Sequence, residues 1–255
     1  MLLKVLGCSG GIGGDLRTTS FLIDQDILVD AGTGVADLSL EEMARIDHIF
    51  LTHSHLDHVL SIPLLADSVI GSRLNPIVVH ATRETWKALK EHIFNWKIWP
   101  DFMVLPTPEK PFVVYEEVLP GVTVELNGRQ FTPIPVNHVV PAVGYQIDSG
   151  THSLVFTGDT TVCDGLWEAI NRIQNFKYLV IETAFSNHEH KLAEMSKHLC
   201  PTTLASELKK LKHPDAEIFI THLKPGEGHV SLRQIRQLVK DYQPTALSNK
   251  QIIEI

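Results

Sequence analysis

The 255-residue sequence contains only three cysteines, which are widely separated at Cys8, Cys163 and Cys200. Their odd number and wide spacing exclude a disulfide framework and a Cys-x-x-Cys metal site. The sequence also has no apolar run that approaches the roughly 20 residues of a membrane-spanning helix. Residues 1–7 have neither the basic region nor the long apolar region of a signal peptide. We therefore expect a cytoplasmic protein that does not bind a membrane.

Positive charge is also scarce, with 22 Lys and Arg residues against 30 Asp and Glu residues and a net charge of −8. Proteins that bind nucleic acids usually have a basic face, so this balance argues against a nucleic-acid partner. A small anion is still an acceptable ligand if metal ions supply positive charge locally. The sequence has no short repeat, low-complexity tract or linker. We expect one domain over residues 1–255, although the length also allows two small domains.

Apolar segments bounded by turn residues predict a protein rich in strands. Strands are expected at residues 2–6, 21–23, 27–29, 46–51, 77–80, 112–115, 122–126, 131–136, 143–147, 154–157, 178–181, 218–220 and 251–255. Helices are expected at residues 41–45, 59–69, 82–94, 166–173, 201–211 and 231–242. Thr82 and Ser231 are the expected caps of their helices, and Pro63 must lie in a first helical turn or cause a kink. The order gives two successive sets of strands and helices, which predicts two sheets packed face to face with helices outside.

The glycine-rich segment 7–14 follows the first strand, but its spacing is not that of a dinucleotide-binding loop. No amphipathic helix follows it, since the chain goes directly into the strand at 21–23. We interpret this segment as a flexible loop near a site.

The densest group of ionisable residues is His53, His55, Asp57 and His58. It follows the predicted buried strand 46–51. Burial fixes the end of this strand, so several side chains of the following turn can converge on one point. Imidazole and carboxylate groups are the ligands that zinc and similar divalent ions prefer. We therefore interpret this stretch as part of a metal site rather than as a histidine-rich surface loop.

Four further apolar runs also stop at an ionisable residue, namely His138, Asp159, Glu182 and His222. Ligand sites in layered α/β proteins gather where strands end and loops begin. If these ends converge, the site holds five histidines and two aspartates, enough for two metal ions that share one carboxylate. We interpret Glu182 as a residue that orients a histidine rather than as a ligand.

These residues resemble the metallo-β-lactamase superfamily, which has His-x-His-x-Asp-His, then a lone His, an Asp and a final His in this order. The resemblance covers nearly the whole chain and implies an α/β fold, a four-layer αββα sandwich with a two-metal site. It implies the following ligand sets: His53, His55 and His138 for one ion, Asp57, His58 and His222 for the other, and Asp159 as a bridge. The expected ions are two Zn2+, with iron or manganese as alternatives.

Three details narrow the expected chemistry. His55 stands where the di-iron redox branch usually has Glu, which favours hydrolysis. Residues 53–62 are similar to the signature of class II cyclic-nucleotide phosphodiesterases, although Pro63 and Asp67 depart from it. Residues 181–185 and 196–199 resemble the paired Glu and His motifs of phosphodiesterase members, including tRNase Z.

The resemblance implies hydrolysis of 3′,5′-cyclic AMP or GMP to the 5′-nucleotide by a hydroxide that bridges two metal ions. Asp57, Glu182 and His198 are the implied catalytic residues. His198 would protonate the departing 3′ oxygen while Glu182 holds its other ring nitrogen. Lys224 either neutralises phosphate or is a plain solvated lysine.

Several alternatives stay open. A tRNase Z-like RNA phosphodiesterase usually has a basic surface and a protruding arm, which this sequence lacks. Hydrolysis of a lactone, thioester or β-lactam would leave His198 and Glu182 without a role, and a metal-binding scaffold would have no turnover. The aromatic segment 95–102 either packs over the core or forms a lid or a homodimer contact.

Overall fold

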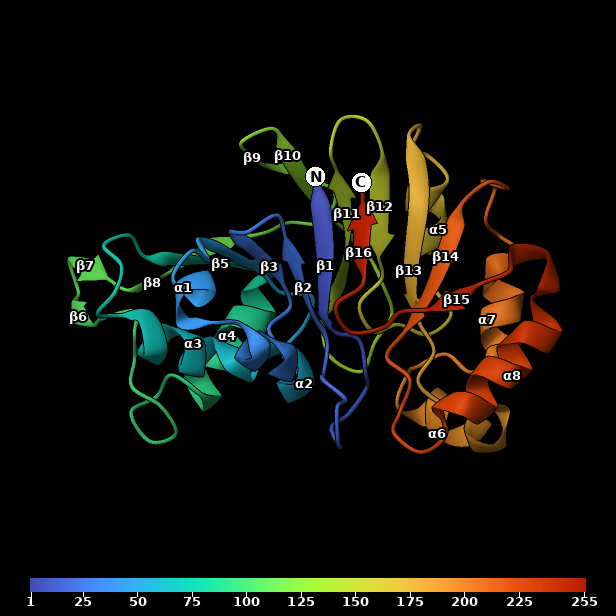
Figure 1. Ribbon diagram of the computed structural model, residues 1–255, viewed down its shortest axis with the longest axis horizontal. Coiled ribbons are helices and arrows are strands. Elements are labelled where there is room, and N and C mark those ends of the chain that lie inside the picture. Colours follow the sequence, from blue (N-terminus) through green and yellow to red (C-terminus); the bar gives the residue numbers. More distant parts are fainter.

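Two seven-stranded sheets form the centre of the molecule, and helices cover their outer faces (Figure 1). The computed structural model describes residues 1–255. The helices within residues 40–92 lie on one side of the pair of sheets, and those at residues 164–170, 201–208 and 228–238 lie on the other (Figure 1). This arrangement confirms the αββα sandwich expected from the sequence. None of the helices has both the length and the apolar character needed to cross a bilayer.

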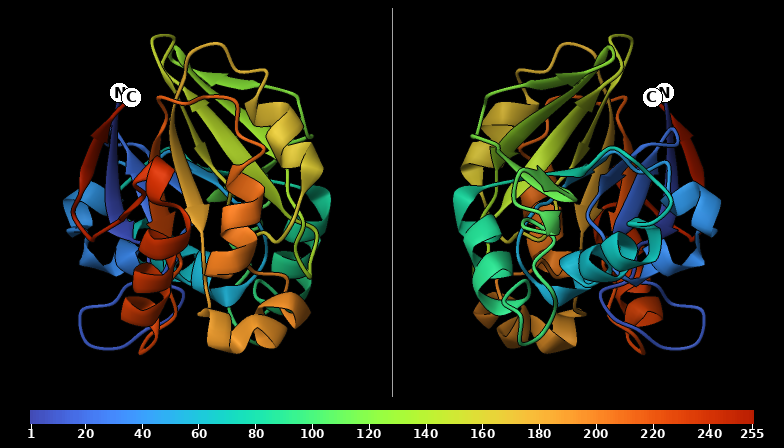
Figure 2. Two further views of the ribbon diagram at one scale, coloured as in Figure 1. Left: turned by 90° about the vertical axis from the view of Figure 1, so that its right-hand side faces the viewer. Right: turned by 90° about the vertical axis from the view of Figure 1, so that its left-hand side faces the viewer.

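The first sheet has the order β16-β1-β2-β3-β4-β5-β8. Its strands are β1 (Leu2–Gly7), β2 (Ser20–Ile23), β3 (Ile27–Val29), β4 (His48–Phe50), β5 (Ile77–Ala81), β8 (Val113–Glu117) and β16 (Ile252–Glu254). Strands β1 to β3 form the expected antiparallel meander, and β3, β4, β5 and β8 are parallel. The last strand, β16, pairs with β1, so both termini lie side by side in each view (Figure 2).

The second sheet repeats this plan in the order β15-β14-β13-β12-β11-β10-β9. Its strands are β9 (Val124–Leu126), β10 (Arg129–Pro135), β11 (Val143–Asp148), β12 (Ser153–Phe156), β13 (Phe176–Glu182), β14 (Glu217–Thr221) and β15 (Thr245–Ala246). Strands β9 to β12 are antiparallel and β12 to β15 are parallel. A small hairpin, β6 (Pro106–Thr107) and β7 (Lys110–Pro111), stands apart from both sheets.

Aromatic side chains fill the space between the two sheets. Phe50 of the first sheet stacks on Phe131 of the second, with ring centroids 4.2 Å apart. Phe21 meets Phe156 edge to face at 4.8 Å. Because helices cover the outer faces, the central strands are buried on both sides, and this explains their continuous apolar runs.

The helices follow the predicted order with several corrections at their ends. They are α1 (Leu40–Met43), α2 (Leu56–Val59), α3 (Ser61–Val69), α4 (Arg83–His92), α5 (Asp164–Ile170), α6 (His190–Met195), α7 (Pro201–Leu208) and α8 (Gly228–Leu238), with 3-10 turns at η1 (Thr33–Asp37), η2 (Asn187–Glu189) and η3 (Lys240–Tyr242). The single helix expected at 59–69 is wrong in its start, because the helical segment begins at Leu56 and is divided at Leu60. Pro63 lies in the first turn of α3, as expected.

Two expected caps have different outcomes. Thr82 caps α4 as predicted, since its hydroxyl accepts a hydrogen bond from the Thr85 amide at 3.3 Å. The predicted cap at Ser231 is wrong, because α8 begins at Gly228 and the Ser231 side chain is buried inside the helix. Helix α6 is absent from the sequence-based prediction.

The aromatic segment 95–102 packs in part against the core. Phe102 is buried and Trp99 is partly buried against the cluster under α3 and α4. Trp96 and Ile98 are 62% and 68% exposed. Packing over the core thus accounts for Phe102 and Trp99, while a lid or homodimer contact at Trp96 stays a prediction.

Candidate metal centre and active site

The structure brings all seven proposed ligands to one edge of the sandwich. His53 follows β4, the next three belong to α2 or its cap, and His138, Asp159 and His222 follow β10, β12 and β14. Their side-chain atoms form three groups, each within 4.8 Å: His53, His55, His138 and Asp159; Asp57, His58 and His222; and Asp159, His198 and His222. The first two groups have the composition of the two expected ligand sets.

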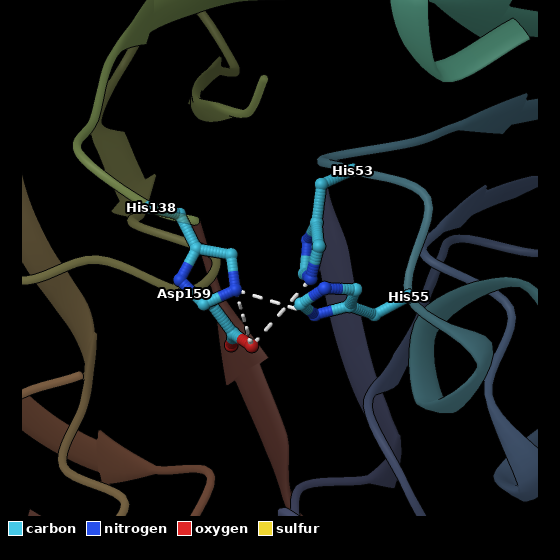
Figure 3. A group of neighbouring side chains, drawn as sticks. All are labelled: His53, His55, His138 and Asp159. Carbon is cyan, nitrogen blue, oxygen red and sulfur yellow. Dashed lines mark hydrogen bonds and ion pairs between the residues drawn. The ribbon is translucent and has the colours of Figure 1, made fainter. Parts of the chain in front are cut away.

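Asp159 is 2% exposed and points toward His53, His55 and His138 (Figure 3). Its Oδ2 atom is 3.5 Å from His53 Nε2 and 3.9 Å from His138 Nε2. Its Oδ1 atom is 3.4 Å from His58 Nε2 and 3.3 Å from His222 Nδ1. One carboxylate therefore presents one oxygen to each histidine group, which is the geometry that a bridging ligand requires.

The Nε2 atoms of His53 and His58 are buried and have no hydrogen-bond partner. Buried polar nitrogens are costly unless they are satisfied. His138 donates from Nδ1 to the carbonyl of Lys197 at 3.1 Å, so its Nε2 has a lone pair, and this atom lies 3.3 Å from His55 Nδ1 and 3.9 Å from Asp159 Oδ2. Each of the two groups thus has inward-facing ring nitrogens beside a carboxylate, which are suitable ligands for divalent metal ions.

Burial keeps most of these rings neutral, which is the form that binds metals. It is the largest cause that lowers the pKa of His138 to about 4 and that of His222 to about 3. Burial likewise holds the pKa of His53 well below its usual value. His58 differs: burial lowers its pKa, but the Asp159 and Asp30 carboxylates outweigh burial and raise the pKa well above its usual value.

Asp30 is a functional residue that the sequence analysis missed. It follows β3, is fully buried, and accepts a hydrogen bond from His58 Nδ1 at 2.7 Å. The Thr52 amide donates to Asp30 Oδ1, and the Thr52 hydroxyl donates to Oδ2, the oxygen that also accepts from His58, both at 2.8 Å. The carboxylate thus fixes the His58 ring and directs Nε2 toward the centre. The sequence does contain a signal for it, because Asp30 directly follows the apolar strand 27–29, as the other ionisable residues follow theirs.

Glu182 and His198 form a buried pair next to the histidines. Glu182 Oε1 accepts hydrogen bonds from His198 Nδ1 at 2.7 Å and from the Thr160 amide at 3.0 Å. Its Oε2 accepts from the amides of Ala184 and Leu199. Four donors therefore fix this carboxylate, which belongs to none of the three ligand groups.

The His198 ring is held over the centre by this pair. It stacks on His222 with centroids 5.3 Å apart and meets His138 edge to face at 5.0 Å. Burial lowers its pKa, but the Glu182 carboxylate outweighs burial and raises the pKa above its usual value. A ring in this setting is suited to hold a proton for transfer.

The glycine-rich loop lies against the same site. Lys224 donates to the Gly10 carbonyl at 2.7 Å and lies 3.4 Å from His222 Nε2. A Cβ atom at Gly10 would come within 2.5 Å of the His222 carbonyl, so only glycine allows this approach. The loop is close to the centre, as expected, and Lys224 contributes positive charge there.

Comparison with known proteins agrees with this geometry. The family model described as "Beta-lactamase superfamily domain" matches residues 25–248. The chain belongs to this superfamily. Metal-dependent hydrolysis is the chemistry that this membership and the His/Asp cluster support. The match covers nearly the whole chain and thus includes both histidine groups.

Curated relatives are similar over most of the chain. A "Probable 3′,5′-cyclic-nucleotide phosphodiesterase" of Yersinia pestis is 26% identical and covers 87% of this chain and 77% of its own. A "3′,5′-cyclic-nucleotide phosphodiesterase" of Aliivibrio fischeri is 25% identical, covering 98% and 86%. A "Ribonuclease Z" of Haloarcula marismortui is 30% identical over a shorter region, 58% of this chain and 47% of its own.

Solved structures show the same fold. The metallo-beta-lactamase fold protein YhfI from Bacillus subtilis has a TM-score of 0.76 at 18% identity, covering 100% of this chain and 99% of its own. Unliganded yeast PDE1 has a TM-score of 0.81 at 17% identity, with the same coverage. The shared fold extends over the full length of the chain.

Proposed function

We propose that the protein is a dinuclear-metal phosphodiesterase that hydrolyses 3′,5′-cyclic nucleotides to 5′-nucleotides. The observation that carries this proposal is the buried Glu182–His198 pair, which holds a proton donor beside the two ligand groups. Two similar proteins that cover most of the chain are named as phosphodiesterases of this substrate class.

The residues present would hold two divalent ions, which we propose to be zinc. The proposed ligands are His53, His55 and His138 on one side, Asp57, His58 and His222 on the other, and Asp159 between them. Such ions, when bound, lower the pKa of water and neutralise phosphoryl oxygens. Lys224 adds positive charge on the His222 side.

His198 supplies the proton for the leaving oxygen. A water oxygen attacks phosphorus in line with the P–O3′ bond, which breaks as the new P–O bond forms. His198 gives a proton to O3′, and the proton lost by the water replaces it, so the product is the 5′-nucleotide. Glu182 stabilises the protonated ring and fixes its orientation through Nδ1.

A tRNase Z-like activity is the second candidate, since a ribonuclease Z is among the similar proteins. The same Glu–His pair would serve RNA cleavage equally well. The net charge of −8 disfavours a long polyanionic substrate, because RNA binding relies on phosphate contacts with basic side chains.

Turnover assays on purified, zinc-loaded protein test the proposal. The substrates are cyclic AMP, cyclic GMP, bis(p-nitrophenyl) phosphate, a tRNA precursor and a lactone. We expect hydrolysis of at least one cyclic nucleotide to its 5′-nucleotide. Cleavage of the tRNA precursor alone would establish the second candidate, and cleavage of the lactone alone would show that the protein is not a phosphodiesterase.

A further inference from the structure

Two cavities open beside the candidate metal centre, and a bridge of hydrogen bonds lies between them. The first, here called the α6 cavity, has a volume of about 340 Å3, and Thr161, Val162, His190, Glu194, Lys197 and His198 are among its lining residues. The second, here called the β8 cavity, has a volume of about 630 Å3, and Arg83, Glu117, Leu119 and His138 are among its lining residues. Both volumes are in the range of small-molecule sites.

The bridge is formed by Lys197, whose ammonium group donates to Asn137 Oδ1 at 3.1 Å and to the His138 carbonyl at 3.2 Å. Asn137 and His138 line the β8 cavity, whereas Lys197 lines the α6 cavity. A substrate held at the centre therefore has two separate directions in which its organic part can extend.

The position of His198 distinguishes the two directions. Its Nδ1 atom is occupied by Glu182, so the substrate meets the rest of the ring. The ring is 7% exposed, and His198 lines the α6 cavity but not the β8 cavity. An oxygen that takes a proton from His198 must approach from the side on which this ring is accessible.

The chemistry of the α6 cavity suits a nucleobase. Val162 is 45% exposed and offers an apolar wall. Lys197 uses two of its three ammonium protons in the bridge, which leaves one for an acceptor. The Glu194 carboxylate can accept hydrogen bonds from the donor groups of a ligand. A purine edge presents both donors and acceptors beside an apolar ring face, and this mixed set of groups is complementary to it.

We propose that the α6 cavity binds the leaving-group side of the substrate, which for a cyclic nucleotide is the nucleoside that keeps O3′. This inference rests on the proposed function. Water supplies the oxygen added to phosphorus, the P–O3′ bond breaks, and O3′ receives its proton while the nucleoside occupies the cavity. Val162, Glu194 and Lys197 then determine which nucleoside is accepted.

The test compares a bulky residue in each cavity. Val162→Trp fills the α6 cavity, and Leu119→Trp, at a 53% exposed position, is the matched change in the β8 cavity. We expect Val162→Trp to raise KM for cyclic AMP and cyclic GMP by about tenfold or more. Leu119→Trp should leave KM within about twofold of the wild type. Glu194→Gln, which keeps the side-chain volume, should raise KM about threefold.

Equilibrium dialysis with 5′-AMP and 5′-GMP gives a second measurement that does not depend on turnover. Binding should weaken in Val162→Trp and not in Leu119→Trp, with unchanged metal content and circular dichroism in both. A larger effect of Leu119→Trp, equal effects of the two variants, or no effect of Val162→Trp would each overturn the assignment. If the wild type binds these nucleotides but cleaves no cyclic nucleotide, the proposed function is wrong. The dialysis still decides whether the α6 cavity binds the nucleoside.

Discussion

Lys197 and His138 are joined by two reciprocal hydrogen bonds. His138 Nδ1 donates to the Lys197 carbonyl at 3.1 Å, and the Lys197 ammonium donates to the His138 carbonyl at 3.2 Å. Lys197 has a left-handed backbone with φ of +52°, which is uncommon for a residue other than glycine. It directly precedes His198. One residue therefore fixes a proposed metal ligand and the start of the segment that carries the proposed proton donor.

Removing the Lys197 ammonium group should loosen the His138 side of the centre. In Lys197→Met the carbonyl still accepts from Nδ1, but the His138 backbone loses its anchor. We expect the affinity for one of the two metal ions to fall about tenfold, as for other residues that orient ligands. Competition with a chromophoric chelator measures this.

The control for that experiment is Lys191→Met, since Lys191 is exposed on α6. It should bind metal as the wild type does. Lys197→Arg, which keeps the charge, should recover part of the affinity. Equal metal affinity in Lys197→Met and the wild type would show that the hydrogen bonds do not position His138.

Asp30 should orient a ligand of the second group, as Lys197 orients a ligand of the first. Asp30→Asn keeps the shape and tolerates the residue's φ of +56°, but it removes the charge that binds His58 Nδ1 at 2.7 Å. We expect the affinity for the ion at His58 to fall about 10- to 100-fold. Metal content after dialysis against a weak chelator measures the loss. Asp37→Asn, at an exposed carboxylate that pairs with Arg17, should retain both ions.

Loss of His198 should reduce turnover without loss of metal. We expect His198→Ala to lower kcat for cyclic nucleotides by about 10²- to 10⁴-fold, because O3′ then leaves without a proton. The loss should be much smaller for bis(p-nitrophenyl) phosphate, whose acidic leaving group departs unprotonated. The exposed His188 provides the control variant His188→Ala. Equal losses on both substrates would exclude proton donation by His198.

Metal removal should destabilise the fold, because the buried nitrogens of His53 and His58 would lose their proposed partners. A ligand present at about 1,000 times its dissociation constant stabilises the folded state by roughly 4 kcal/mol. For a chain of this size, chelation should lower Tm by about 10 °C. Calorimetry with and without a chelator measures the shift. Asp159→Asn, which removes the charge shared by both groups, should show a much smaller chelator effect.

The sequence predicted the sheets and the position of the candidate site for the same reason. Buried strands appear in the sequence as continuous apolar runs, and an ionisable residue at the end of such a run is easily recognised. Asp30 obeyed this pattern, but it also fitted a turn. The role of Lys197 could not be predicted from the sequence, because Lys197 acts through its backbone carbonyl and contacts a residue 59 positions away.

Helix ends were less predictable than strands. Helix α8 begins at Gly228, a poor helix former, and Ser231 lies inside it although serine favours caps. Helix α6 has only six residues, too few for an apolar period to be recognised. Tertiary packing, rather than local preference, decides both helices. The α6 cavity was therefore not accessible from the sequence.

The pair of His48 and His80 should make the first sheet sensitive to acid. His80 is buried and stacks on Phe50 with ring centroids 4.2 Å apart. Its Nε2 atom lies 3.0 Å from His48 Nδ1. Burial first, and His48 second, lower the pKa of His80 to about 4 from its usual value of 6.5. Glu116 is the facing carboxylate, 3.5 Å from His80 Nδ1.

Because the folded-state pKa of His80 lies below the unfolded value, protonation favours unfolding. Its neutral form contributes fully above pH 6.5, and the contribution is lost as pH falls from 6.5 toward 4. We expect a loss of about 2 kcal/mol near pH 5 from this residue. Urea unfolding of the wild type and of His80→Gln at about pH 7 and about pH 5 measures it.

The difference between the two pH values should be smaller in His80→Gln than in the wild type, since glutamine does not titrate. The metal centre also loses stability in acid, but this loss is common to both proteins and cancels in the comparison. His92→Gln, at an exposed position on α4, should keep the full pH dependence of the wild type. If His80→Gln also keeps the full pH dependence, then His80 either is already protonated in the folded protein at neutral pH or is solvated despite its burial.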